Sequence, residues 1–333
     1  DGTITAPAAD ESSRVEHEVA SDNATRGGFF RGSSARNFGL ILALVVLCIA
    51  GTVSAGERFA SVDNLMVVLS QASIIGVLSI GMTFVITAGG IDVSVGSVLG
   101  IAAVWATTLS TQAYAEAWGW WVIVLTSLLV GLGAGVVNGV LIAYGKVVAF
   151  IATLAMMVAA RGFAELIAGR RTQIVNVDSF LETFRGDLLG IPAIVWIFVL
   201  VAIGGWFLLN RTTFGRRTVA VGGNPEAARL AGIKVKRHTM YLYALVGLTA
   251  GIASIMMLAR TTAGSSTNGM LYELDAIAAV VVGGTLLVGG RGTIVGTVLG
   301  VLIFATLTNI FIQANLDLSL IHISEPTRPI SIA

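Results

Sequence analysis

The feature that most constrains this chain is a series of long, nearly uncharged apolar stretches between residues 38 and 313. A helix that crosses the hydrocarbon of a membrane needs about 20 mostly apolar residues. One charge at its centre costs about 2.5–3.5 kcal/mol on insertion scales, and these stretches keep their charged residues near their ends. The alternating segments of about 10 residues that indicate a transmembrane β-barrel are lacking. The sequence therefore predicts an all-α, polytopic transmembrane helical bundle.

We predict nine apolar segments, near residues 38–55, 64–87, 94–112, 119–144, 147–168, 190–209, 239–259, 274–289 and 293–313. The segment 274–289 is shorter than most of the others, contains Asp275 and ends in glycines. These properties favour a re-entrant or broken helix over a full span, since non-helical backbone is tolerated at membrane depth where protein or water surrounds it.

Composition supports a membrane protein and argues against an enzyme. Of the 333 residues, 55% are hydrophobic and 12% are charged, whereas soluble domains carry roughly 25% charged residues. The 40 glycines suit helices that approach one another closely. His17, His238 and His322 have no nucleophile or metal-ligand partner at a useful spacing. We expect no catalytic residue, no metal site and no cofactor bound by this chain.

The distribution of basic residues predicts the orientation. The loop 210–238 carries seven Lys and Arg residues and one acid, Glu226, so the positive-inside rule places it in the cytoplasm. Six predicted spans precede this loop. The polar tail 1–37, which we expect to be disordered, is therefore cytoplasmic too. The segment 161–189 disagrees, because it should lie outside and yet contains Arg161, Arg170, Arg171 and Arg185.

An internal repeat relates two glycine-rich segments. Residues 89–100 align with residues 289–300, and seven of the twelve positions are identical. Each copy leads into an apolar span. Internally repeated halves are common in transporters, although chance similarity between two glycine-rich helix starts would give the same pattern.

The loop 215–233 contains the signals of a short helix. Asn224 can cap a helix, Pro225 suits its first position and Glu226 suits the positive end of the helix dipole. Gly232 can end the helix. The segment is either a solvated basic loop or a short helix that docks into a cleft on a soluble partner.

Several motifs together resemble one family. Gly215–Ile233 looks like the cytoplasmic coupling segment of permease subunits of bacterial ABC importers for ribose, xylose, arabinose and related monosaccharides. Gly89–Gly96 resembles the glycine-rich start of that family's third span. Asn138-Gly139, residues 150–154, and residues 279–285 followed by 289–292 also match its pattern, in the expected order.

The resemblance implies a multi-pass protein of the bacterial inner membrane that does not bind ATP itself. Such permeases form a dimeric pathway, take ATP-driven movement from a soluble ATP-binding subunit, and receive sugar from a periplasmic or secreted binding protein. Membrane lipid is the remaining expected partner, and nucleic acid is not one. The residues that would couple to the ATPase are Gly222, Gly223, Asn224, Pro225, Glu226, Ala227, Ala228, Arg229 and Gly232.

Two glycine-rich segments are candidates for the translocation pathway. Gly89–Gly96 lacks the lysine of a phosphate-binding loop and contains Asp92, so a structural break before a helix is the better interpretation. Asp92 and Ser94 are candidate caps of that helix. The segment 283–292 suits either a pathway lining or tight packing. The candidate pathway residues are Gly89, Gly90, Asp92, Ser94, Gly96, Asn138, Thr153, Gly283, Gly284 and Thr285.

The C-terminal end departs from the family. The resemblance implies a tenth apolar span, whereas residues 314–333 are a tail in which 321–330 is polar and interrupted by proline. We therefore expect a final span to be missing. Residues 319–333 resemble a translated sequencing adapter, so we expect them to be non-native. The permease domain then covers 38–313.

The alternative function is a stand-alone secondary transporter or channel for a small polar solute. Asp92, Arg161, Glu165 and Asp275 lie near predicted span ends, which disfavours a proton relay. A purely structural scaffold has no feature in its favour.

Overall fold

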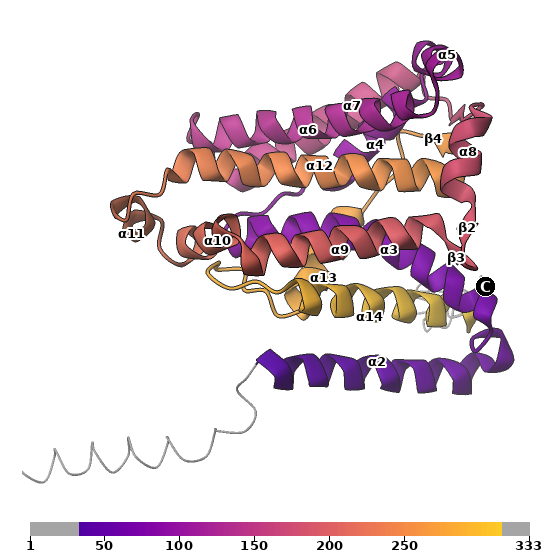
Figure 1. Cartoon of the computed structure of the whole chain (residues 1–333), viewed down its shortest axis with the longest axis horizontal. Coiled ribbons are helices and arrows are strands. Elements are labelled where there is room, and N and C mark those ends of the chain that lie inside the picture. Colours follow the sequence, from indigo (N-terminus) through magenta and orange to yellow (C-terminus); the bar gives the residue numbers. More distant parts are fainter. Residues whose placement is uncertain (1–32, 315–333) are drawn as a thin grey trace, which may run out of the picture.

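The computed structural model describes residues 33–314, and these form a bundle of helices (Figure 1). Within these residues, seven helices are long and apolar enough to cross a membrane. They are α2 (Ser33–Ala55), α3 (Val62–Thr87), α6 (Trp121–Ala143), α7 (Ala149–Ala168), α9 (Ala193–Arg211), α12 (Val235–Thr261) and α14 (Ile294–Gln313). The helical bundle predicted from the apolar stretches is confirmed. Helix α2 begins before residue 38, so the tail ends earlier than predicted, and residues 1–32 and 315–333 lie outside the described part.

Short elements connect these helices. They are the 3-10 helix η1 (Gly56–Arg58), α4 (Val95–Ala106), α5 (Leu109–Trp118), α8 (Asp178–Arg185), α10 (Thr213–Gly223), α11 (Pro225–Leu230) and α13 (Tyr272–Val282). Two antiparallel strand pairs complete the described chain: β1 (Gln173–Ile174) with β4 (Ala263–Gly264), and β2 (Asp187–Leu188) with β3 (Ile191–Pro192).

Two of the nine predicted apolar segments are not spanning helices. In place of a span at 94–112, α4 has 12 residues and ends at Ala106. Thr107 bonds its hydroxyl back to the Ala103 carbonyl oxygen at 2.9 Å, and Thr108 then caps the separate helix α5. Helix α13 has 11 residues, about half the length needed to cross hydrocarbon. Mean hydropathy does not register that Thr107 and Thr108 end one helix and begin another, which explains the difference at 94–112. The short helix α13 agrees with the re-entrant or broken helix predicted for 274–289.

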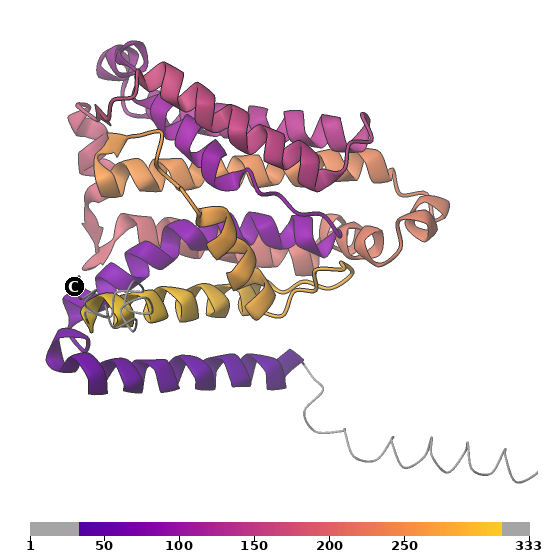
Figure 2. The same cartoon turned by 180° about the vertical axis from the view of Figure 1, so that it is seen from behind.

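The two short helices begin close together inside the bundle (Figure 2). An extended segment leads from α3 to α4, and the segment 265–271 leads from β4 to α13. A Cβ atom on Gly96, in the first turn of α4, would overlap the carbonyl oxygen of Gly269. Glycine at both positions therefore allows the two chain segments to meet.

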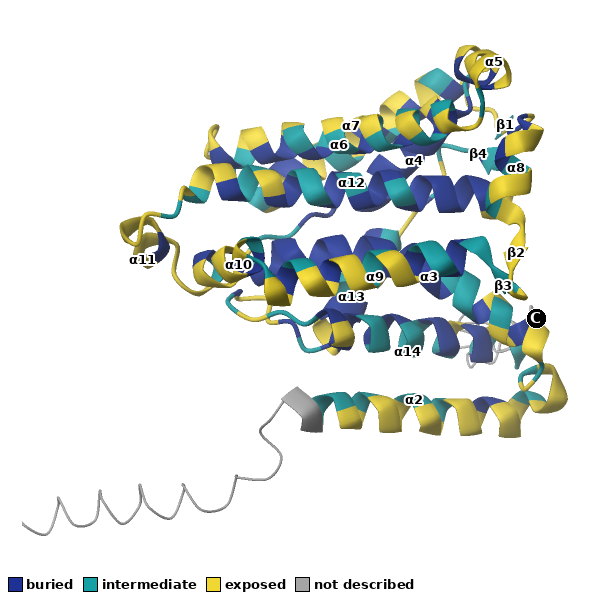
Figure 3. Cartoon of the chain, viewed as in Figure 1, coloured by how far each residue is buried: buried dark blue, intermediate teal, exposed yellow. Residues whose placement is uncertain are grey.

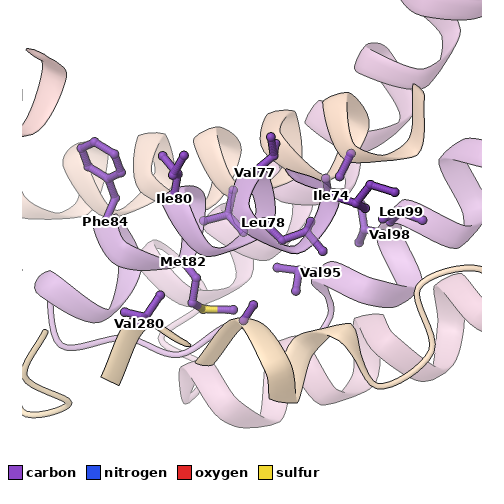
Figure 4. Close-up of a cluster of buried hydrophobic side chains, with 14 of the residues drawn as sticks. Ile74, Val77, Leu78, Ile80, Met82, Phe84, Val95, Val98, Leu99 and Val280 are labelled. Carbon is purple, nitrogen blue, oxygen red and sulfur yellow. The ribbon is translucent and has the colours of Figure 1, made fainter. Parts of the chain in front are cut away.

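Helices α3 and α12 form the centre of the bundle. Ile74, Leu78 and Met82 of α3 are fully buried, and they belong to a cluster that includes Val95 and Leu99 of α4 (Figure 4). By contrast, α2 packs mainly on α14 and is exposed along most of its length (Figure 3). Apolar exposed helix surface is what a lipid-facing or subunit-facing position requires.

The two ends of the bundle differ in what they carry. The start of α2, helices α10 and α11, and the connections α6–α7 and α13–α14 lie at one end (Figure 1). Helices α5 and α8 lie at the other end. The N-terminal side of α2 and the basic loop 210–238 therefore share an end. Five spanning helices precede this loop, and the extended segment after α3 together with α4 makes the further crossing (Figure 2).

Candidate functional site

The predicted short helix after Asn224 is present as α11. The Asn224 side-chain oxygen accepts a hydrogen bond from the backbone N–H of Ala227 at 3.0 Å, and Pro225 occupies the first turn. Glu226 lies in the same turn and pairs with Arg229 at 2.8 Å. Gly232 follows the helix with φ +85°, and its N–H donates to the Arg229 carbonyl oxygen. The cap, the first turn and the glycine end are thus confirmed as local structure.

Most of α11 faces outward. Ala228 is buried, whereas Glu226, Ala227 and Arg229 are exposed and Leu230 is 80% exposed. An exposed leucine at the end of a short helix is available to a partner surface. The preceding residues form a second helix, α10, which was not predicted and which contains Gly222 and Gly223.

Three glycine motifs that are far apart in sequence meet where α10 ends. A Cβ atom on Gly222 would overlap the Thr87 carbonyl oxygen and lie 2.6 Å from the Gly290 nitrogen. A Cβ atom on Gly289 would lie 2.8 Å from the Gly222 carbonyl oxygen and 2.9 Å from the Gly89 nitrogen. We call the contact of Gly89, Gly222, Gly289 and Gly290 the glycine junction. No spacing in the sequence reveals it.

Hydrogen bonds fix the glycine junction. Gly290 N–H donates to the Thr87 carbonyl oxygen at 2.8 Å, and Gly90 N–H donates to the Val85 carbonyl oxygen at 2.9 Å. One turn away, the hydroxyls of Thr83 and Thr297 lie 2.8 Å apart between α3 and α14. These bonds hold the turn after α3 against the turn before α14, and the end of α10 packs on both through Gly222.

The predicted internal repeat stays a prediction. Its two glycine-rich copies do contact each other, through Gly89 and Gly289. However, the helices that follow them differ, because α4 has 12 residues and α14 has 20.

Asp92, Ser94 and Asn138 form a buried polar chain. The Asn138 amide donates to the Ser94 hydroxyl at 3.0 Å, and that hydroxyl donates to the Asp92 carboxylate at 2.6 Å. The Ser94 N–H also donates to Asp92 at 2.8 Å. Ser94 occupies the cap position of α4, but its hydroxyl makes no capping bond because it is directed to Asp92. All three side chains are enclosed in this conformation.

The remaining candidate pathway residues lie elsewhere. The Thr153 hydroxyl bonds to the Ala149 carbonyl oxygen of its own helix at 2.9 Å. Gly283 packs against Gly296 of α14, and Gly284 has φ +87°. Thr285 accepts a hydrogen bond from the Thr293 N–H at 3.3 Å. The contacts of Gly283 and Thr285 hold the α13–α14 connection. A part in transport for Thr153, Gly283, Gly284 and Thr285 stays a prediction.

Arg161 has a structural function that sequence reasoning missed. Its guanidinium donates to the carbonyl oxygens of Ser266 and Asn268, the latter at 2.9 Å. It thereby holds the segment that leads to α13 against α7. Because the Arg161 guanidinium is bound to carbonyl oxygens within the protein, Arg161 is not a free loop charge. It therefore counts less than Arg170, Arg171 or Arg185 when the positive-inside rule is applied to segment 161–189.

No group of three or more His, Cys, Asp or Glu side chains within residues 33–314 is arranged to hold a metal ion. The exposed, capped helix α11 is connected through α10 to the glycine junction, and all three lie at one end of the bundle (Figure 1).

Comparison with known proteins identifies the family of this chain. Residues 64–322 match the family described as "Branched-chain amino acid transport system / permease component". The chain belongs to this family of transport permeases. It is thus a multi-pass membrane protein of the transport machinery, and the family resemblance inferred from the motifs is confirmed.

Curated relatives of this permease include sugar permeases. It is 42% identical over 275 residues to the "Ribose import permease protein RbsC" of Escherichia coli K12, covering 81% of this chain and 84% of the relative. Against the ribose import permease of Bacillus subtilis 168 the identity is 40%, covering 82% and 84%. The "Xylose transport system permease protein XylH" of E. coli K12 is 33% identical, covering 86% and 88%. No solved structure shows a significant match to the permease.

Proposed function

We propose that this chain is the membrane-spanning subunit of an ATP-binding cassette importer that carries a monosaccharide of the ribose or xylose type across the bacterial inner membrane. The names of the relatives, at 42% and 33% identity over more than four fifths of the chain, support the sugar. The chain binds no ATP. A separate ATPase subunit supplies the energy, and a periplasmic or secreted sugar-binding protein supplies the substrate.

The observation that carries the coupling proposal is the continuity from α11 to the glycine junction. Helix α11 is exposed and follows α10 directly after Asn224, and α10 ends at the glycine junction with Gly222 against Thr87 and Gly290. A partner that moves α11 therefore displaces the connections α3–α4 and α13–α14. Packed elements transmit such shifts because interiors are dense.

The orientation follows from charge. The loop 210–238 with its seven basic residues faces the cytoplasm, and the N-terminal side of α2 lies at the same end. The ATPase then docks from the cytoplasm on residues 222–232. Two copies of the chain enclose the pathway, with lipid around them. We keep Gly89, Gly90, Asp92, Ser94 and Gly96 as pathway candidates, together with Asn138, Thr153, Gly283, Gly284 and Thr285.

Charge reversal on α11 tests the coupling. The permease is reconstituted in proteoliposomes with its ATPase and binding protein, and ATP-driven uptake of labelled ribose is measured for Glu226→Lys. We expect uptake to fall at least about tenfold, because the substitution opposes the helix dipole and places a cation where the partner binds. Glu116→Lys on α5, an exposed acid at the opposite end, is the charge-matched control and should transport normally.

A second substitution separates docking from helix stability. In Glu226→Lys/Arg229→Glu the ion pair of α11 is restored with reversed sign. If docking matters, uptake stays low in this double variant. Unchanged uptake in Glu226→Lys, or uptake that collapses with an ionophore while ATP is held constant, contradicts the proposal and favours a stand-alone transporter.

A further inference from the structure

A basic groove lies between α10 and α12, beside α11. It has a volume of about 520 Å³, within the range of small-ligand sites. Its cations come from three parts of the chain: Arg217 from α10, Lys234 from the linker after α11, and Arg237 from α12. No acidic residue lines the groove.

The three cations have no acidic partner within residues 33–314. The one ion pair in that part of the chain that involves this loop joins Glu226 to Arg229 on α11. Arg217, Lys234 and Arg237 are all exposed. Three like charges around one concavity repel each other, so an anion in the groove would relieve an unfavourable arrangement.

Local contacts orient the side chains that line the groove. Arg237 donates a hydrogen bond to the Tyr241 hydroxyl, and its guanidinium lies over the Tyr241 ring at 5.4 Å from the centroid. The Thr218 hydroxyl oxygen and His238 Nε2 lie 2.9 Å apart, and both side chains are buried beneath the groove. No side chain caps the start of the 27-residue helix α12, so its first N–H groups add positive potential.

The positive-inside rule explains why this loop is basic, but not why these three residues converge. Arg216 and Lys236, the neighbours of Arg217 and Arg237 in sequence, are exposed and do not line the groove. Guanidinium groups match phosphate oxygens bidentately, and an ammonium group adds a point charge. The groove also lies where the spanning helix α12 begins, and basic residues next to the cytoplasmic end of a span attract anionic lipid headgroups.

We propose that the groove lined by Arg217, Lys234 and Arg237 is a binding site for a phosphate group, carried by an anionic phospholipid headgroup or by a small soluble phosphate. A phosphate held there bridges α10, α12 and the linker that follows α11. It therefore steadies α11 from both sides. The site does not depend on which sugar is transported or on the presence of the ATPase.

Binding to the purified full chain in neutral detergent tests the site. Three ligands are titrated at constant ionic strength: mixed micelles with phosphatidylglycerol, mixed micelles with phosphatidylcholine, and inorganic phosphate. The readouts are a saturable rise in Tm and the number of bound lipids by native mass spectrometry. We expect phosphatidylglycerol or inorganic phosphate to bind more tightly than phosphatidylcholine, and the arm that saturates identifies the source.

Matched variants locate the binding. Arg217→Gln/Arg237→Gln should weaken binding at least about tenfold, since hydrogen bonds to charged groups are each strong. Arg216→Gln/Lys236→Gln removes the same charge from the same helices outside the groove and should leave affinity within about twofold. If Arg217→Gln/Arg237→Gln does not fold, Lys234→Gln is used instead. Lys234 is exposed in the linker before α12, and its replacement should weaken binding by itself.

Two outcomes overturn the proposal. One is the absence of saturable binding of all three ligands to the wild-type chain. The other is equal weakening by the groove variant and by its control, which indicates diffuse attraction to a basic surface. If the groove variant impairs only assembly with the ATPase and phosphate never binds, the cations serve a protein interface and the phosphate site is wrong.

Discussion

The backbone N–H of Gly290 donates a hydrogen bond to the carbonyl oxygen of Thr87 at 2.8 Å, and this bond joins the end of α3 to the connection before α14. Gly222 of α10 packs directly against both groups. A contact between bare backbones leaves no room for a side chain. The glycine junction is therefore the place where small substitutions should have the largest effect.

Gly222→Ala tests the junction. Its Cβ would overlap backbone atoms of Thr87 that cannot rotate away, and overpacking costs about 1–3 kcal/mol. We expect a lower Tm in detergent and a loss of most ATP-driven uptake. The neighbouring Gly223 has no atom within 4 Å of an added Cβ, so Gly223→Ala should keep the wild-type Tm. Equal behaviour of the two variants would contradict the junction.

Asn64 and Asn309 should stabilise the contact of α3 with α14. Their side-chain amides exchange two hydrogen bonds, at 3.0 and 2.8 Å, and Gln313 adds a third to Asn64 at 3.0 Å. We expect Asn309→Leu to cost about 1 kcal/mol, within the range measured for hydrogen bonds between membrane helices. A double-mutant cycle with Asn64→Leu, followed by thermal unfolding, should show a coupling energy. Simple additivity would mean that the pair contributes nothing.

Arg161 should control the segment that leads to α13. Arg161→Gln removes charge-assisted hydrogen bonds to Ser266 and Asn268, which are worth about 1.5–3 kcal/mol each. We expect hydrogen exchange in residues 265–271 to become at least about tenfold faster. Arg171→Gln, an exposed cation after the same helix, serves as the control. Unchanged exchange in Arg161→Gln would show that the segment is held by packing alone.

Thiol labelling should decide whether the buried polar chain belongs to the pathway. Cys48 is the single cysteine of the chain, so a Cys48→Ser background is free of thiols. Ser94→Cys and Thr297→Cys, both at buried positions, should resist maleimide in the isolated permease. During ATP-driven turnover with its partners we expect Ser94→Cys to react and Thr297→Cys to stay protected. A Ser94→Cys thiol that never reacts would leave packing as the function of Asp92, Ser94 and Asn138.

Local signals in the sequence predicted several parts of the site. Asn224, Pro225 and Gly232 predicted α11 because a cap, a first-turn proline and a terminal glycine act on adjacent backbone groups. Asp275 and the glycines after it indicated that 274–289 is not a full span, and α13 is indeed short. The span predicted at 94–112 was wrong, since mean hydropathy does not register that Thr107 and Thr108 end one helix and begin another.

The sequence by itself determined that the chain is a helical membrane bundle and where α11 begins and ends. These properties depend on apolar length and caps, each of which acts within about one helix. Only the tertiary structure decided that Gly89, Gly222 and Gly289 meet, that Arg161 reaches Ser266 and Asn268, and that Arg217, Lys234 and Arg237 surround one groove. Such contacts depend on how separate helices pack, and the packing of the whole bundle sets that geometry.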